Sequence, residues 1–586
     1  MPRKSGQPIQ ILGKGGPWSL LPAQTWSILT DFFIFALGLS FFYFIVVLAR
    51  TWFGPFNPHV EISRSPAMLP VYAAYSLLRI MVAYALSLVF TLVYGYVAAY
   101  NAKAERFMVP LLDILQSIPV LSFLPGVMLA MVALFPRHQM GVELGAILLI
   151  FTGQVWNMAF SFYSSLKSIP REMREAAKIY QFNWYQRFTN IELPYSAIGL
   201  VWNSMMSVAG GWFFLMACEM FVLGDKDFRL PGLGSYLQTA ASAGDTRSIL
   251  WGVATMITVI VLMDQVVWRP IIAWAEKFKM EQVESADAPQ SWFLDLIQGS
   301  RVLVSLRKRV FRPVGEWLDL RFARQHHAVE TVASPPTWRV WVGRAITAVA
   351  VCVVLYAVAR ATGMLSQLSR EDYKEILTGA FATFLRVVAA LVIGSLWTIP
   401  VGVAIGFNPK LARIAQPLAQ IAASVPATAL FPIVLLLLIR IGGGMGVGSV
   451  LLLLLGTQWY ILFNVIAGAM AIPTDLKEAS TLFRFTSAQR WRTVILPGIF
   501  PYLITGLVTA SGGAWNASIV AEYFRLKDQT YTTVGLGAVI SRATDAGNFD
   551  LLLGSTIVMA MVVVTINRLV WRRMYRLAAT RYTMDV

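Results

Sequence analysis

Two polar segments, 303 residues apart, carry the same residue types at the same spacing. Residues 169–194 read IPREMREAAKIYQFNWYQRFTNIELP, and residues 472–497 read IPTDLKEASTLFRFTSAQRWRTVILP. Each opens with Ile-Pro, places Glu-Ala-Ala or Glu-Ala-Ser five residues after that proline, and closes with Leu-Pro. Charged residues followed by aromatic ones suit a protein–protein interface. We therefore interpret both segments as docking loops for a partner rather than as caps of a helical bundle.

A second repeated set places ionisable residues inside apolar segments. Arg79 corresponds to Arg386, and Glu219 corresponds to Glu522. Ionisable residues within membrane spans mark transport pathways or buried polar contacts. The arginines could attract an anion, or they could lock helices through ion pairs with the glutamates. The other candidates for a translocation path lie near Gly-Gly or Gly-Gly-Ala sequences and are Ser207, Trp212, Ser511, Trp515 and Asn516.

The residues give no sign of catalysis or of metal binding. A phosphate-binding loop needs the pattern GxxxxGK[ST], and the nearest candidate, Gly13-Lys14-Gly15-Gly16, lacks both the upstream glycine and the Ser or Thr. The two cysteines, Cys218 and Cys352, lie far apart in apolar segments. We expect no catalytic residue, no metal site and no cofactor in this chain.

The elements that must position these residues are membrane-spanning helices. The chain is 57% hydrophobic and 13% charged, whereas soluble domains carry about 25% charged residues. About twenty apolar residues cross a bilayer, and about twelve such stretches are present. The predicted spans are 27–49, 71–99, 109–134, 143–163, 197–223, 249–273, 339–361, 376–406, 413–439, 446–470, 499–523 and 550–571. The sequence therefore predicts an all-α polytopic membrane protein.

The spans form two homologous halves of six. Prolines, glycines and tryptophans recur between the halves at offsets of 307 and then 303 residues. Because each half has an even number of spans, the repeat is parallel, about an axis along the membrane normal. The predicted parts are an N-terminal tail (1–26), a first transmembrane domain (27–275), a linker (276–337), a second transmembrane domain (338–572) and a C-terminal tail (573–586).

The net charge of +17 is concentrated in the tails, the docking loops and the linker. With twelve spans and a cytoplasmic N-terminus, all of these fall on the inner side, as the positive-inside rule requires. We therefore expect cytoplasmic termini and no nucleic-acid partner. The linker mixes Lys and Arg with Trp, Leu and Phe, which fits either an amphipathic helix on the inner leaflet or a plain helical tether.

The docking loops resemble the cytoplasmic loop of permease subunits in ATP-binding-cassette importers, where short coupling helices dock on an ATPase subunit. The resemblance covers nearly all of both halves and implies the type I importer permease fold. It implies that one ATPase subunit meets Glu175, Ala176, Ala177, Leu193 and Pro194, and the other Glu478, Ala479, Ser480, Leu496 and Pro497. The family's glycine in this loop is replaced by Gln181 and Arg484, which leaves the turn geometry open.

A further resemblance lies in the Gly-Trp sequence followed by Glu219 or Glu522 and by a Gly-Leu-Gly turn. It is similar to the nitrate, taurine and alkanesulfonate branch of these permeases. The resemblance implies import of a small anion across a bacterial inner membrane. It also implies ATP-Mg on two separate ATPase subunits, an extracytoplasmic substrate-binding protein and membrane lipid as partners.

The alternative is a secondary transporter of the major-facilitator type, which also has two six-span halves. That class carries its basic signature between the second and third spans. Here the corresponding turn, residues 101–106, reads only NAKAER.

Overall fold

The structure is a computed structural model that describes residues 31–32, 61–223, 226–278, 291–300, 305, 307–323, 337–440, 444–526 and 529–581. Its contacts divide the chain into two compact units. One comprises Met1–Thr51, Pro170–Pro194 and Asp264–Glu330, and the other comprises Trp52–Ile169, Tyr195–Met263 and Thr331–Val586. The second unit contains most of both halves, so this division cuts across the predicted domain boundaries.

The described elements follow the same order in each half. The first half has α2 (Leu69–Tyr100), α3 (Ala102–Ser117), η2 (Val120–Phe123), α4 (Leu124–Leu134), α5 (Met140–Ser168), α6 (Arg171–Ile179), α7 (Trp184–Arg187), α8 (Leu193–Glu219), β1 (Val222–Leu223), β2 (Lys226–Asp227), α9 (Leu233–Ser242), α10 (Thr246–Met263) and α11 (Arg269–Ala275). The second half has α15 (Thr337–Leu365), α16 (Arg370–Phe407), α17 (Pro409–Ser424), α18 (Ala427–Arg440), α19 (Met445–Ala471), α20 (Thr474–Leu482), α21 (Ser487–Arg490), α22 (Leu496–Ala521), β3 (Tyr523–Leu526), β4 (Gln529–Thr532), α23 (Leu536–Asp545), α24 (Phe549–Ile566) and α25 (Arg572–Arg581). Between the halves lie α12 (Trp292–Gly299) and α14 (Arg312–Ala323).

Among the described residues, eight helices are long and apolar enough to cross a membrane, and each coincides with a predicted span. They are Pro66–Tyr100, Met140–Ser168, Trp184–Glu219, Thr246–Ala275, Arg370–Phe407, Met445–Ala471, Ser487–Ala521 and Phe549–Ala578. The predicted span 339–361 coincides with α15, whose described side chains are mainly exposed. The predicted span 27–49 lies outside the described residues, apart from residues 31–32. Of the predicted C-terminal tail, residues 573–581 belong to α25.

The predicted spans 109–134 and 413–439 are wrong as continuous helices. Each is two helices broken at a Ser-x-Pro sequence, between α3 and α4 and between α17 and α18. The residue before each proline is extended, with φ −81° and ψ 125° at Ile118 and φ −75° and ψ 115° at Val425. Proline excludes its predecessor from the helical region, so an apolar run long enough to span becomes two short helices.

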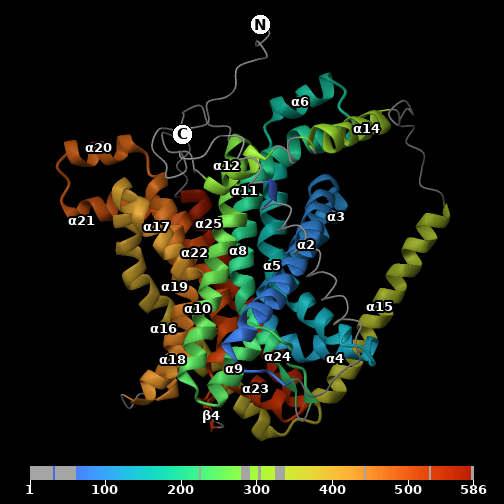
Figure 1. Cartoon of the computed structure of the whole chain (residues 1–586), viewed down its shortest axis with the longest axis vertical. Helices are drawn as coiled ribbons and strands as arrows, with labels where there is room; N and C mark the ends of the chain where they lie inside the picture. Colours follow the sequence, from blue (N-terminus) through green and yellow to red (C-terminus); the bar gives the residue numbers. More distant parts are fainter. Residues whose placement is uncertain are drawn as a thin grey trace. The chain divides into compact units, whose positions relative to one another are not determined.

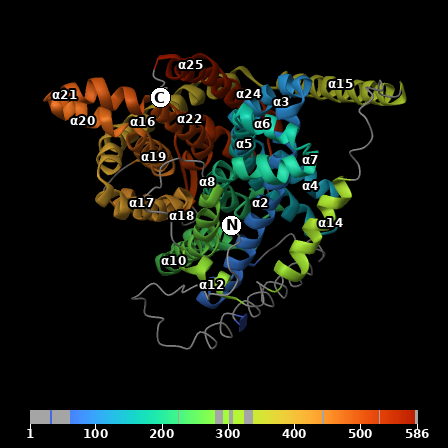
Figure 2. The ribbon, with the colours of Figure 1, turned by 90° about the horizontal axis from the view of Figure 1, so that it is seen from above.

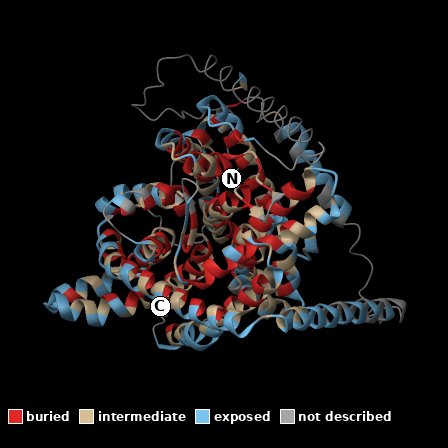
Figure 3. Ribbon diagram, turned by 90° about the horizontal axis from the view of Figure 1, so that it is seen from below, coloured by how far each residue is buried: buried red, intermediate tan, exposed pale blue. Residues whose placement is uncertain are grey.

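Long helices run side by side in the larger unit, with α20 and α21 at one end and α23 at the other (Figure 1). Buried residues concentrate inside this bundle (Figure 3). In the second half, α19 packs against both α16 and α22 (Figure 2). Small residues permit this close approach. A Cβ added to Gly506 of α22 would lie 3.0 Å from the Tyr460 carbonyl oxygen and 3.1 Å from the Ile461 Cα of α19.

We predict that Gly506→Val destabilises the protein by about 1–3 kcal/mol, because the added methyl groups overpack a backbone contact. Gly512→Val in the same helix is the matched control, since a Cβ at Gly512 meets nothing within 4 Å among the described residues. The measurement is the melting temperature of each variant in detergent. Equal melting temperatures for the two variants would contradict the packing described here.

Candidate functional site

Each docking loop is a pair of short helices joined by a left-handed residue. The first loop contains α6 and α7, and the second contains α20 and α21. Gln181 has φ 51° and Arg484 has φ 52°, and they are the only non-glycine residues with positive φ in the described chain. Glycine favours this region because it has no Cβ. The turn that the family builds with glycine is therefore formed here, in both loops, by residues that adopt it with strain.

The same hydrogen bonds close both turns. The Phe182 N–H donates to the Ala177 carbonyl at 2.9 Å, and the Phe485 N–H donates to the Ser480 carbonyl at 3.0 Å. This six-to-one bond, with a left-handed residue just after the helix, is the Schellman motif. The carbonyl of the third residue of the Glu-Ala-Ala or Glu-Ala-Ser motif therefore accepts the bond that caps the helix, and this residue is buried in both loops.

The other motif residues have matching environments in the two loops. Glu175 and Glu478 are exposed, while Ala176 and Ala479 are half-buried. The closing Leu-Pro pairs begin the long helices: Leu193 and Pro194 open α8, and Leu496 and Pro497 open α22. A π-helical turn precedes each of them, at Phe188–Glu192 and at Trp491–Ile495.

Each loop carries a pair of exposed apolar residues, and of these four only Phe483 belongs to the aromatic residues that the sequence predicts as anchors for a partner. Ile179 and Tyr180 are 78% and 74% exposed, and Leu482 and Phe483 are 81% and 72% exposed. They lie at equivalent positions, directly before the left-handed residue of each loop. Large apolar side chains exposed together mark interaction sites. The signal in the sequence was an apolar pair conserved between the two copies at the end of a charged helix.

The second loop is also fixed to the end of a membrane helix. The Lys477 Nζ lies 4.7 Å from the centre of the Phe407 ring, and the Arg490 guanidinium lies 5.6 Å from it. Cations over an aromatic face are attracted by its quadrupole. Partial burial and, to a lesser extent, the charge of Arg490 lower the pKa of Lys477. Phe407 is the last residue of α16, so these contacts connect α20 and α21 to that helix.

A buried ionic cluster lies at the opposite end of the larger unit. The Arg79 Nη1 is 2.7 Å from Glu219 Oε1, and both side chains are almost fully buried. Ser76 also donates to Glu219 Oε1 at 2.7 Å, and the Gly234 N–H donates to Glu219 Oε2 at 2.7 Å. A Cβ added to Gly232 would lie 2.3 Å from the Glu219 carboxylate. The Gly-Leu-Gly turn thus closes over the carboxylate, and α2, α8 and α9 meet at this one group.

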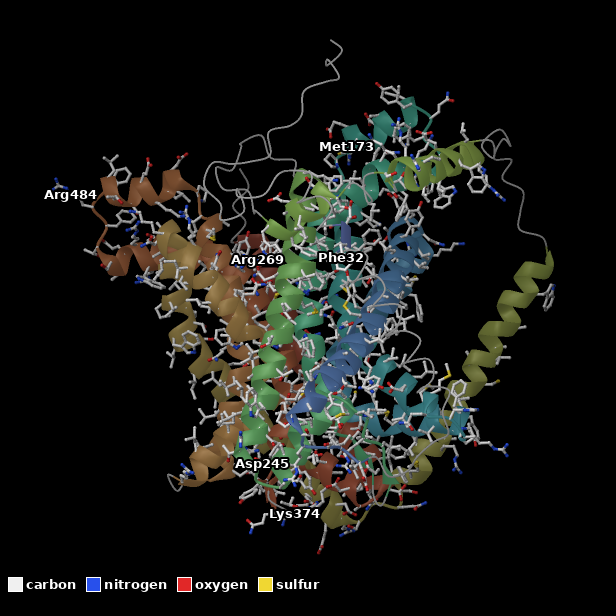
Figure 4. All side chains as sticks on the ribbon, viewed as in Figure 1. Phe32, Met173, Asp245, Arg269, Lys374 and Arg484 are labelled. Carbon is white, nitrogen blue, oxygen red and sulfur yellow. The ribbon has the colours of Figure 1, made fainter. Side chains whose placement is uncertain are left out.

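The second half repeats this cluster. The Arg386 Nη1 is 2.9 Å from Glu522 Oε1, the Thr383 hydroxyl donates to the same oxygen at 2.8 Å, and the Gly537 N–H donates to Oε2 at 2.8 Å. The ion pairs required by the helix-locking interpretation are therefore present in both halves. Figure 4 labels Arg484 at the tip of the second docking loop, and Asp245 and Lys374 at the end where the clusters lie.

The two clusters differ by one carboxylate. The buried Glu143 at the start of α5 receives two hydrogen bonds from Arg79, at 2.6 and 2.8 Å. The equivalent position in the second half is Gly446, and Arg386 donates instead to the Thr533 hydroxyl at 2.8 Å. Glu143 has no counterpart in the second half, so the repeat alone does not reveal it.

The remaining path candidates lie in α8 and α22. Ser511 and Trp515 line an apolar cavity of about 610 Å³, together with residues of α16 and α24. Asn516 is half-buried and donates to the Gly512 carbonyl at 3.1 Å. Ser207 and Trp212 are buried in α8 and do not line this cavity. The structure therefore brings only two of the candidates together.

Several buried polar atoms near these candidates have no hydrogen-bond partner among the described residues. They are the Ser207 hydroxyl, both indole N–H groups of Trp212 and Trp515, and both polar atoms of the Gln154 amide. Gln154 lies in α5 against Gly211, where an added Cβ would be 2.4 Å from its Nε2. Its counterpart Thr457 is instead satisfied by the Leu453 carbonyl, so repetition could not reveal Gln154.

We predict that Arg79→Met destabilises the protein more than Arg386→Met. Breaking a buried ion pair leaves an uncompensated charge and costs about 3–5 kcal/mol. Arg79 serves two carboxylates and its side chain is 1% exposed, whereas Arg386 serves one and is 14% exposed. Chemical unfolding in detergent measures both variants. An Arg386→Met variant as unstable as Arg79→Met would contradict the asymmetry.

We predict that Gln181→Gly stabilises the first docking loop by about 0.5–1 kcal/mol, because it removes left-handed strain. Gln181→Val should destabilise the same turn, since β-branched residues fit this region poorly. Hydrogen exchange of the peptide containing α6 and α7 measures the effect. Exchange should slow in the glycine variant and accelerate in the valine variant, and the opposite order would count against the observed turn.

Comparison with known proteins identifies the architecture. The family model described as the inner membrane component of binding-protein-dependent transport systems matches residues 87–267 and residues 398–582. Each match contains one docking loop and one of the two repeated buried glutamates, Glu219 or Glu522.

Curated relatives of the chain are transport permeases. The taurine transport system permease protein of Escherichia coli is 29% identical over 181 residues, which is 31% of this chain and 62% of that protein. The bicarbonate transport system permease protein of Synechococcus elongatus is 28% identical over 178 residues, 28% of this chain and 63% of that protein. The nitrate import permease protein of Synechocystis is 26% identical over 186 residues, 32% of this chain and 62% of that protein. The chain thus spans less than two thirds of each of these three relatives.

The two matched ranges together cover more than half of the chain and carry the same fold. The chain therefore belongs to the family of inner membrane components of binding-protein-dependent transport systems, and it contains the family domain twice.

Proposed function

We propose that this chain forms the complete membrane pathway of an ATP-driven importer. Two separate ATPase subunits, each with ATP-Mg, dock on the two loops, and an extracytoplasmic binding protein delivers the solute. The observation that supports this most strongly is the repeated turn, which places an exposed glutamate and an exposed apolar pair in the same way in both loops. A single chain with two docking loops needs no second permease copy.

The proposed cargo is a small anion of the nitrate, bicarbonate, sulfonate or organic acid class. The printed functions of the relatives support this class. Because Arg79 and Arg386 already neutralise buried carboxylates, we assign them to helix locking rather than to anion binding. The indole N–H of Trp515, which has no partner among the described residues and belongs to a side chain that lines the cavity, is better placed to replace the hydration of a passing anion.

In the proposed cycle, ATP binding draws the docking loops together and opens the pathway outward, and hydrolysis returns it inward. The two halves rock around the bilayer midplane, as in other transporters built from repeats. The proposed setting is a bacterial inner membrane with cytoplasmic termini. An ion-gradient mechanism of the major-facilitator type is not retained, because the family match covers both halves.

We predict that Glu175→Arg combined with Glu478→Arg abolishes association with the ATPase subunits and leaves membrane insertion intact. Both carboxylates are exposed on the docking loops, so the charge reversal acts on the interface and not on the fold. Pull-down of the ATPase subunits from detergent extracts measures association, and ATP-dependent uptake in vesicles measures coupling.

The matched control is Glu61→Arg combined with Glu371→Arg. These residues are also exposed, and they precede or open the helices α2 and α16 at the end opposite to the second docking loop. The control variant should bind the ATPase subunits normally. Normal ATPase binding and uptake in the docking-loop variant would overturn the proposed coupling role.

A further inference from the structure

The linker helix α14 and the π-helical turn that precedes it, Arg307–Phe311, carry an apolar stripe that is exposed in the described structure. Val310, Val314, Trp317 and Leu320 are 45%, 48%, 54% and 63% exposed. Val310 and Val314 are four residues apart, and Trp317 follows three residues later, so they follow one face of the helix. A stripe of this kind on a helix of low overall hydrophobicity is the pattern of an interfacial helix.

The charges beside the stripe indicate what covers it. Residues 307–321 contain five basic residues and only two acidic ones. Lys308, Arg309 and Arg312 lie on the exposed surface at the start of the helix. The Arg321 guanidinium lies 5.0 Å from the centre of the Trp317 ring, so a cation stacks on an aromatic residue of the stripe. Basic residues around an apolar stripe fit an anionic lipid surface.

The path of the chain also keeps this segment near the bilayer. The linker begins directly after α11, which ends the spanning helix Thr246–Ala275, and it ends at α15. At its start, the Lys277 ammonium lies 4.4 Å from the ring of Trp274 and 4.8 Å from that of Phe278. Aromatic residues beside a lysine are typical of the membrane–water interface. The start of the linker is thus tied to a membrane-spanning helix, and its end leads into α15, where the sequence predicts a further span.

Within its compact unit, α14 packs against α7 of the first docking loop (Figures 1 and 2). The π-helical turn Phe188–Glu192 alone separates α7 from the spanning helix α8. The element that carries the exposed stripe therefore supports one of the two docking loops from the side.

We propose that α14 lies on the anionic inner leaflet with Val314 and Trp317 inserted, and that it anchors the first docking loop to the membrane surface. The second loop has a different support, the contacts of Lys477 and Arg490 with Phe407. This inference goes beyond the transport function, because lipid binding by α14 requires neither a substrate nor an ATPase.

Spin labels on the full-length chain in nanodiscs test the position of α14. Labels are placed singly at Val314→Cys and at Glu316→Cys in a Cys352→Ser background, since Cys352 is exposed and Cys218 is buried. Glu316 pairs with Arg312 on the polar side of the helix. In equimolar phosphatidylcholine and phosphatidylglycerol, oxygen should relax the label at position 314 at least twofold more than a water-soluble nickel chelate does. The label at position 316 should show the reverse.

Two results would overturn the position. Preferential relaxation by the nickel chelate at both positions would show a tether in water. Loss of access to both reagents at position 314, only when the ATPase subunits are added, would show a protein-docking surface instead. In the variant that combines Arg309→Glu with Arg312→Glu, the ratio of relaxation by oxygen to relaxation by the nickel chelate at position 314 should fall. An unchanged ratio would show that anionic lipid does not hold the helix.

A second measurement tests the anchoring of the loop. Trp317→Glu should increase the mobility of a label at Glu172→Cys in the first loop and leave a label at Asp475→Cys, the equivalent position in the second loop, unchanged. If the label at position 172 had the same mobility with and without Trp317→Glu, α14 would not anchor the first docking loop. These labels report on lipid contact and mobility without ATP, so failure here is distinguishable from failure of the proposed coupling role.

Discussion

The buried carboxylate near the end of α8 and of α22 is the constraint on which each half depends. A carboxylate in a membrane interior is tolerated only when it is paired and hydrogen-bonded. Glu219 and Glu522 meet this requirement with an arginine from α2 or α16, a hydroxyl one turn earlier in the same helix, and a backbone N–H of the Gly-Leu-Gly turn. The helix that supplies the arginine and the turn that follows the glutamate are therefore joined at one carboxylate in each half. The first glycine of each turn is required because a Cβ at Gly232 or Gly535 would collide with that carboxylate.

The halves share this framework but not its details. Glu143 adds a third buried charge to the first cluster and connects α5 to it, whereas the second cluster has Thr533 in a more exposed site. The unpaired amide of Gln154 also has no counterpart in the second half. Because both halves belong to one chain, equivalent positions in the two halves can be substituted independently of each other. The first half then has a more extensive buried polar network than the second.

Much of the fold and of the candidate site can be predicted from the sequence because the sequence contains two homologous halves. Repetition identified the docking loops and both arginine–glutamate pairs, and hydropathy predicted eight spans that each overlap a helix long and apolar enough to cross a membrane. Repetition also limits what can be found: Glu143 and Gln154 occur in one half only. Pro119 and Pro426, where two predicted spans break, occupy equivalent positions in the two halves of the sequence. The length of the apolar run nevertheless predicts continuous spans, because a hydropathy scale does not include the steric effect of proline on the residue before it.

The left-handed residue of each docking loop has a consequence for recognition. A glycine there would leave the turn residue of both loops without a side chain. Gln181 and Arg484 accept backbone strain, and in return each tip carries a side chain, a neutral amide in one loop and a cation in the other. The two docking loops of this chain therefore present different chemistry at equivalent positions. A partner that docks on the first half can thus be distinguished from a partner that docks on the second.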